Sequence, residues 1–144
     1  MTLHKVFGAM LALTIFLSGC DKKEEEAIPS NNNECFFNTH LDSTQIANRL
    51  LGKWDWQYSF SGWTSQYSNE AHKGLTLEFK TSGVLVVSRN GIVEQTVNWT
   101  LQPEWQMFTE PIIFETLGPL YFCDDLLLFQ GGAFDATNNY YKRK

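Results

Sequence analysis

Few side chains in this sequence have the types and the spacing that catalysis requires. Outside the N-terminal segment the histidines are His40 and His72, and neither stands in a pattern that pairs a nucleophile with a base. Asp124 and Asp125 are adjacent acids, but neighbours on a strand point in opposite directions, so a turn explains them better. We therefore expect no enzymatic activity, no catalytic residue and no cofactor.

The cysteines offer covalent chemistry rather than catalysis. Apart from Cys20, the chain contains Cys35 and Cys123. In an oxidising compartment they form a disulfide, which would stabilise the fold by about 4–5 kcal/mol, or they stay as two thiols with Cys123 buried in a strand. Because there is no Cys-x-x-Cys pair and histidines are few, we expect no structural metal site.

The N-terminal segment has the features of a signal peptide. Lys5 provides a short basic head, and residues 6–17 are apolar. This stretch is shorter than the roughly 20 residues of a membrane-spanning helix, and it ends in small residues. We therefore expect residues 1–19 to be an export signal that is removed.

The residues Leu17-Ser18-Gly19-Cys20 resemble the lipobox of bacterial lipoproteins. This resemblance implies that Cys20 is acylated, for example with palmitate, and becomes the mature N-terminus. Each buried lipid methylene contributes about 0.8 kcal/mol, so several chains together anchor a protein stably. We therefore expect attachment to a membrane through the lipid on Cys20.

Residues 20–40 are predicted to form a lipid-bearing, disordered tether. The block Asp21-Lys22-Lys23-Glu24-Glu25-Glu26 and the asparagines that follow cannot bury apolar surface. One interpretation of this block is a plain solvated spacer. The other is an address, because basic residues followed by acids resemble the export signal of some Gram-negative lipoproteins. That resemblance implies a place on the outer membrane, facing the cell exterior.

The charge of the mature chain excludes some partners. Removing residues 1–19 takes away only Lys5 among the charged side chains, so 10 basic and 16 acidic side chains remain, a net charge of −6. A negative net charge argues against nucleic acid as a partner and against electrostatic binding to anionic lipids.

Beyond the tether, a short helix is predicted to lead directly into an aromatic strand. Asp42 can cap the helix with Gln45 reaching back to it, and Gly52 suits the helix exit. After Gly52 apolar and polar residues alternate, which is typical of a strand with one buried face. The side chains predicted to share that face are Trp54, Trp56, Tyr58 and Phe60.

The rest of the chain predicts short strands joined by tight turns. Asn90-Gly91 is a type I′ hairpin signal. Strands are expected at residues 74–80, 84–87, 93–102, 106–108, 112–115, 120–123, 126–130 and 139–143. One helix followed by about eight strands predicts an all-β domain over residues 41–144, an antiparallel up-and-down barrel with the helix closing one end.

Two segments of this barrel resemble lipocalins. Gly52-Lys53-Trp54, on a first strand preceded by a short helix, resembles their Gly-x-Trp signature, and residues 140–143 are similar to their terminal segment. Residues 75–83 are similar to a hairpin of small bacterial lipocalin-like lipoproteins. The resemblance implies a calycin-type barrel with Gly52, Trp54 and Arg143 as its structural signature, the Arg side chain stacking on the Trp ring.

A lipocalin-like barrel implies the binding of a small apolar ligand. We expect this ligand to enter at the end opposite the helix, under the polar loop of residues 61–73. Gln95 is a polar exception on an apolar face, so it could orient the ligand. The predicted ligand-binding residues are Trp56, Tyr58, Trp63, Tyr67, Phe79, Gln95 and Trp99.

The same residues also suit a barrel without a ligand. In that case the aromatic side chains fill the interior, Gln95 bonds to backbone or water, and Trp63 and Tyr67 fold back over the core. The protein then acts through its loops as an inhibitor or protein-interaction module, or as a structural accessory of a surface complex. The sequence identifies neither a ligand nor a protein partner.

Overall fold

Helix α2 (Ser43–Leu50) and strand β1 (Gly52–Ser61) form as the local sequence predicts. The computed structural model describes residues 33–37, 41–102, 106–116, 118–131 and 137–144. The side chain of Asp42 accepts a hydrogen bond from the backbone N–H of Gln45, and the side chain of Gln45 accepts one from that of Asp42. Gly52 then turns the chain with a φ of +114°, which L side chains rarely adopt.

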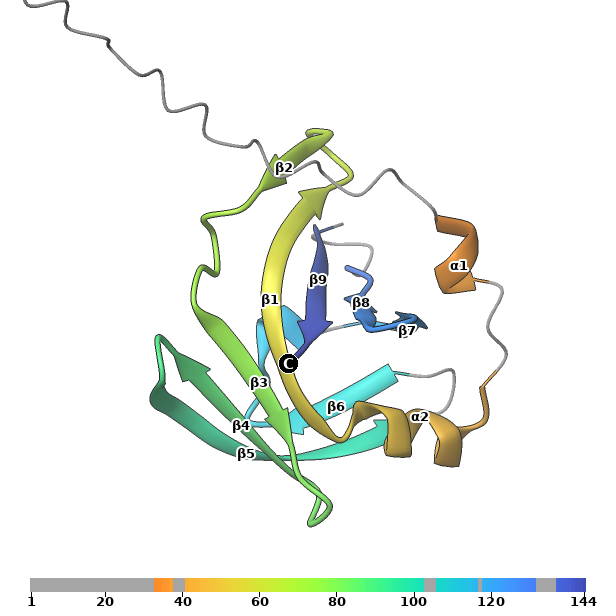
Figure 1. The fold of residues 1–144 in the computed structure, drawn as a ribbon, viewed down its shortest axis with the longest axis vertical. Helices are drawn as coiled ribbons and strands as arrows, with labels where there is room; N and C mark the ends of the chain where they lie inside the picture. The colour runs from red at the N-terminus through yellow and green to blue at the C-terminus, as the bar shows by residue number, and fades with distance from the viewer. Residues whose placement is uncertain (1–32, 38–40, 103–105, 117, 132–136) are drawn as a thin grey trace, which may run out of the picture. The chain divides into compact units, whose positions relative to one another are not determined.

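The strands form one antiparallel sheet. Its order is β6-β5-β4-β3-β1-β9-β8-β7, and β2 pairs with β1 outside this path. Strands β3 to β6 and strands β7 to β9 pair with their neighbours in the chain, and β1 pairs with both β3 and the last strand, β9 (Figure 1). The bounds are β2 (Gln66–Ser68), β3 (Leu75–Phe79), β4 (Val84–Arg89), β5 (Ile92–Gln102), β6 (Gln106–Glu110), β7 (Leu120–Cys123), β8 (Leu126–Phe129) and β9 (Thr137–Arg143).

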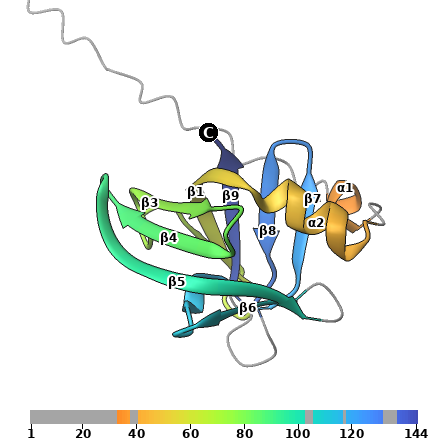
Figure 2. The ribbon, with the colours of Figure 1, turned by 90° about the horizontal axis from the view of Figure 1, so that it is seen from below.

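The ends of this strand order come together. Among the described residues, one bridge joins Gln106 of β6 to Pro119, which precedes β7. Because Pro119 has no backbone N–H, it cannot donate to a longer ladder here. Eight strands thus form a nearly closed antiparallel barrel, which confirms the predicted architecture. Helix α2 lies at the end of the barrel where β1 begins (Figure 2).

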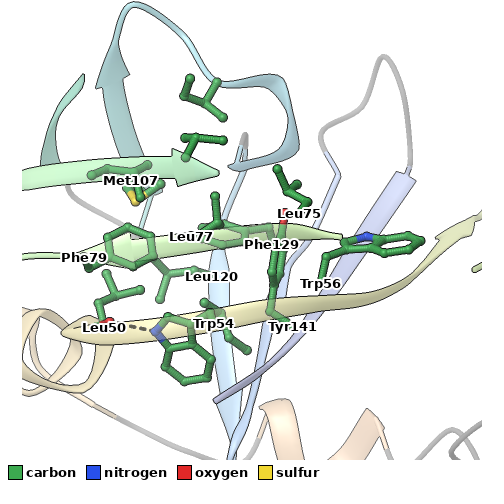
Figure 3. Packing of buried hydrophobic residues seen from close by; sticks show 14 of the residues in the cluster. Leu50, Trp54, Trp56, Leu75, Leu77, Phe79, Met107, Leu120, Phe129 and Tyr141 are labelled. Carbon is green, nitrogen blue, oxygen red and sulfur yellow. Dashed lines mark hydrogen bonds between the residues drawn. The ribbon is translucent and has the colours of Figure 1, made fainter. Parts of the chain in front are cut away.

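Large apolar side chains fill the interior of the barrel (Figure 3). A side chain with no exposed surface borders no space large enough for a water molecule. The side chains with an exposed fraction of 0% are Leu50, Trp54, Leu77, Leu85, Leu127, Phe129 and Tyr141, contributed by α2 and by five strands. The indole N–H of Trp54 donates to the backbone oxygen of Leu50 at 2.7 Å, which joins α2 to this core.

A β-bulge in β1 changes the face that its later residues occupy. Trp56 pairs with Tyr141, but after a register shift Tyr58 pairs with Tyr140, so the intervening Gln57 is an extra residue. Trp56 and Tyr141 therefore belong to the interior cluster, whereas Tyr58 and Tyr140 belong to a cluster on the outer face. The prediction of one continuous aromatic face is wrong, because only its two tryptophans face inward.

The outer cluster is covered by helix α1 (Asn33–Phe37). Phe36 is 6% exposed and packs there with Leu128 and Tyr140. A disulfide joins Cys35 to Cys123 of β7, so of the two alternatives for these cysteines the bridge is present. The predicted tether therefore extends too far, because residues 33–37 belong to the folded unit Asn31–Lys144.

One predicted strand is a different element. Residues 112–115 were expected to be extended, but a 3-10 helix, η2 (Phe114–Thr116), occupies the end of this stretch. The backbone N–H of Ile113 donates to the side chain of Thr109, and the side chain of Thr116 donates to the backbone oxygen of Ile113. These local bonds replace a strand ladder, while Ile113 is still buried.

Several sequence predictions concern residues outside the described part of the chain. They are the signal peptide of residues 1–19, the lipidated Cys20, the charged block after it, and His40. Within the described residues, no helix has the length and apolar character needed to cross a membrane.

Candidate functional site

The predicted ligand-binding residues do not come together in one place. Trp56, Phe79 and Trp99 face the interior, where Phe79 and Trp99 meet edge to face with ring centroids 5.5 Å apart. The indole nitrogen of Trp99 is buried, and among the described residues it has no hydrogen-bond partner. This indole N–H is therefore the polar group of the interior to which a bound ligand could offer a hydrogen-bond acceptor.

The other four predicted residues lie outside the interior. Tyr58 and Tyr67 are on the outer face, with ring centroids 5.8 Å apart. Trp63 is 75% exposed in the turn between β1 and β2. Gln95 is exposed on β5, because β6 begins to pair with β5 only at Asn98. By its register Gln95 shares the face of Val97 and Trp99, as the sequence predicts, but its exposure leaves it outside the buried interior.

A polar network lies at the end of the barrel toward which β1 runs. The indole N–H of Trp56 donates to Ser59 Oγ at 3.3 Å, and Ser59 Oγ donates to Asn139 Oδ1 at 2.6 Å. Asn139 Nδ2 and the hydroxyl of Tyr141 both donate to the backbone oxygen of Glu115, at 3.3 and 3.5 Å. Complete burial, with Glu115 nearby, raises the pKa of Tyr141 well above its ordinary value.

His72 closes this network from the loop before β3. Its Nδ1 lies 3.5 Å from Glu115 Oε1, and its ring meets the Trp56 ring edge to face at 5.5 Å. The sequence gives no signal for this pair, because a fold contact joins residues that are 43 positions apart. The hydrogen bonds of Ser59 run to Trp56 and Asn139 rather than to His72. The network therefore closes the barrel end without aligning a nucleophile with a base.

The opposite end carries the contact that the lipocalin resemblance implies. The guanidinium of Arg143 lies 4.3 Å from the centroid of the Trp54 ring. Its Nη1 donates to the backbone oxygen of Leu51 at 2.9 Å, and its Nη2 donates to that of Arg49. A Cβ on Gly52 would lie 3.3 Å from Arg143 Nη1, so glycine leaves room for this arrangement. Arg143 and Trp54 thus bond the last carbonyls of α2, which a helix leaves without partners.

The outer face carries a row of aromatic rings in contact, which we call the aromatic band: Phe36, Tyr58, Phe60, Tyr67 and Tyr140. Tyr58 stacks on Tyr140 with centroids 4.4 Å apart, and Tyr140 meets Phe36 of α1 at 6.0 Å. On the other side Tyr67 of β2 meets Phe60 at 4.8 Å. Burial raises the pKa of Tyr58 and of Tyr140 above the ordinary value. The band therefore runs without interruption from α1 to β2.

Strand β5 presents an edge that is paired on one side only. Residues 92–97 lie against β4, whereas β6 pairs with β5 only from Asn98 to Gln102, and no other described strand takes its place. Ile92 is 72% exposed and Val93 is 58% exposed. Such an edge is a template for another extended chain.

One set of described side chains has the spacing of a metal site. One ligand atom from each of Cys35, Cys123 and Asp124 lies within 4.8 Å of the others. The two sulfurs are joined in the disulfide, so they are not available as thiolate ligands.

Comparison of the chain with protein-family models, curated proteins and solved structures gives no significant match. The barrel is consistent with a calycin-like fold, and its function must be inferred from its interior and its surfaces.

Proposed function

We propose that this protein is a lipid-anchored lipoprotein of the outer membrane, facing the cell exterior, whose lipocalin-like barrel binds a protein partner through the free edge of β5. The anchor rests on Leu17-Ser18-Gly19-Cys20, and the surface location on the charged block that follows Cys20. The observation that carries the binding role is the unpaired half of β5 with its exposed Ile92 and Val93.

The filled interior favours a partner outside the barrel over a ligand within it. A pocket for a small molecule has a volume of roughly 300 Å³ or more. Seven interior side chains from α2 and five strands have an exposed fraction of 0%, so a ligand of that size at their positions would have to displace them. The buried indole N–H of Trp99 is the observation that favours the carrier, and it supports a small ligand as the second candidate.

The edge of β5 lacks two of the features that usually block an edge, lysine and proline. Its sequence, IVEQTVNWTLQ, contains neither lysine nor proline. Its charged residue, Glu94, is engaged with Arg89 at 3.0 Å and is the extra residue of a bulge, so the charge and the bulge, which can protect an edge, both lie before Thr96. Natural edges are commonly protected by lysine or proline, so an edge that lacks both suits strand addition by a partner.

The hydrogen-bonding direction along β5 identifies which backbone groups a partner would use. The backbone N–H of Trp99 donates to the backbone oxygen of Gly83, so Trp99 bonds toward β4. In an antiparallel ladder the direction alternates, and the N–H of Thr96 therefore points to the free side. Thr96→Pro removes this donor, whereas Thr96→Val keeps it and provides the matched control.

Site-specific photo-cross-linking on intact cells tests the proposal. A photoreactive residue at Gln95 should yield a discrete protein adduct, and the same residue at the exposed Phe108 of β6 should not. Adding Thr96→Pro should abolish the adduct, and adding Thr96→Val should retain it, with circular dichroism showing that both variants are folded. An adduct that persists with proline, or no adduct at all, refutes strand addition. A saturable change of tryptophan fluorescence with fatty acids or retinoids would favour the carrier instead.

Two further experiments test the anchor. Cys20→Ala should abolish labelling with radioactive palmitate and release the protein from the membrane fraction, because the acylated sulfur is removed. Neutral replacements at residues 22–26 should leave the lipid in place but protect the protein from protease added to intact cells. If both forms are cleaved equally, the charged block is only a spacer.

A further inference from the structure

The turn between β1 and β2 combines exposed aromatic rings with an absence of charge. Residues 56–69 contain no acidic or basic side chain. Trp63 lies in the turn and is 75% exposed, and Tyr67 on β2 is 39% exposed. Tryptophan and tyrosine side chains are amphipathic, and they are enriched where a membrane meets water.

The aromatic band connects this turn to α1, the first described element after Cys20 in the sequence. Ring contacts lead from Tyr67 through Tyr58 and Tyr140 to Phe36 in α1, and the next residue, Phe37, is 46% exposed. Asn33, where α1 begins, is 13 residues after Cys20. However they are arranged, 13 residues span at most about 47 Å. A lipid on Cys20 therefore holds the domain within about 47 Å of the bilayer, and the exposed rings decide which face rests on it.

We propose that Phe37, Trp63 and Tyr67 form a membrane-docking surface that rests in the headgroup region of the bilayer in which the Cys20 lipid is inserted. This inference depends on the lipid anchor of the proposed function, but not on binding at the β5 edge. The mature chain has a net charge of −6, so attraction to anionic lipid cannot drive the contact. The burial of the aromatic rings in the headgroup region must drive it instead. Weak intrinsic affinity suffices, because the anchor makes docking an intramolecular event.

Docking on this surface would set the orientation of the domain. In the eight-strand order β5 is four steps from β9 in either direction around the barrel. The aromatic band lies on the outer face of β1 and β9, with α1 and β2 beside it. A barrel that rests on the band therefore presents the free edge of β5 away from the membrane, where a partner can reach it.

Vesicle flotation with the complete mature chain carrying Cys20→Ser tests the docking surface without the lipid. We expect binding to phosphatidylcholine vesicles that falls at least fivefold with Trp63→Ala plus Tyr67→Ala. The exposed Phe108, on β6, provides the matched control, and Phe108→Ala should change binding less than twofold. Adding phosphatidylglycerol should not increase binding, and brominated lipid should quench the Trp63 contribution to the fluorescence.

Three results would overturn the proposal: no binding at millimolar lipid, the effective concentration that a short tether supplies; equal losses for Trp63→Ala plus Tyr67→Ala and for Phe108→Ala; or binding that requires anionic lipid. A protein adduct from a photoreactive residue at position 63, without vesicle binding, would assign the surface to a protein partner. Thr96→Pro should leave vesicle binding unchanged, so failure of the docking surface and failure of the β5 interaction are distinguishable.

Discussion

Arg143 should contribute more to stability than its exposed position suggests. Its guanidinium lies over the buried Trp54 ring and donates to two backbone oxygens at the end of α2. The two hydrogen bonds contribute about 0.5–1.5 kcal/mol each, and a cation–π contact at a partly exposed site about 0.5–1 kcal/mol. Allowing for solvent around the side chain, we expect Arg143→Ala to lower the free energy of unfolding by about 2–3 kcal/mol.

Arg143→Lys separates the two effects. Lysine keeps the charge over the Trp54 ring, but a single ammonium group cannot reproduce the planar fork that reaches the oxygens of both Leu51 and Arg49. We therefore expect Arg143→Lys to recover about half of the stability lost in Arg143→Ala.

Urea unfolding followed by tryptophan fluorescence measures these differences. With a slope of about 2 kcal/mol per M, Arg143→Ala should lower the midpoint by about 1–1.5 M at constant slope. Lys142→Ala is the control, because the Lys142 side chain forms an exposed ion pair with Asp125 at 3.7 Å, which contributes less than about 1 kcal/mol. If Arg143→Ala loses no more stability than Lys142→Ala, the proposed capping role of Arg143 is wrong.

Three further predictions concern the disulfide, the buried network and the tyrosines. Replacing Cys35 and Cys123 by alanine should lower the free energy of unfolding by up to about 4–5 kcal/mol, since the bridge closes an 88-residue separation; a change within 1 kcal/mol would contradict this. Ser59→Ala should cost about 1–3 kcal/mol in urea unfolding, because it leaves the indole N–H of Trp56 without its acceptor; no loss would show that the bond is replaced. Burial raises the folded pKa values of three tyrosines, so their contribution to stability is complete below pH 10 and the free energy of unfolding should fall as the pH rises above it. An absorbance titration in which all five tyrosines ionise normally before unfolding would refute this. These three are Tyr58, Tyr140 and Tyr141.

The architecture was predictable where local chemistry decides the structure. The capping box of Asp42 and Gln45 depends on residues three positions apart, and it forms as expected. The hairpin turn at Asn90-Gly91 forms with a positive φ at both residues, as its sequence favours. The contact of Arg143 with Trp54 was predictable only through the resemblance to lipocalins, since no local rule joins residues so far apart.

The polar network was not predictable, because its partners are brought together by the fold. His72 occurs in a polar loop and Glu115 in a stretch that was expected to be a strand. The sequence positions of His72 and Glu115 follow no spacing that would predict their contact. The 3-10 helix η2 places Glu115 at the barrel end. Helix α1 was missed for a related reason: five residues are too few to form a stable helix alone, and the disulfide and the packing of Phe36 hold it in place.

The bulge at Gln57 explains why alternation gave the wrong face for half of β1. Alternation identifies a buried face only when the opposite face is polar, and here the outer face is apolar as well. Tyr58 and Phe60 suit either side, so hydrophobicity alone cannot locate an extra residue between Trp56 and Tyr58. Because the Tyr58 and Phe60 rings lie outside, Ser59 between them lies inside. There Ser59 Oγ accepts a hydrogen bond from the indole N–H of Trp56, which would otherwise be buried without a partner. The same shift creates an outer aromatic surface that α1 and β2 cover only in part, and this remaining exposure is why the outside of the barrel, more than its interior, is the place to look for function.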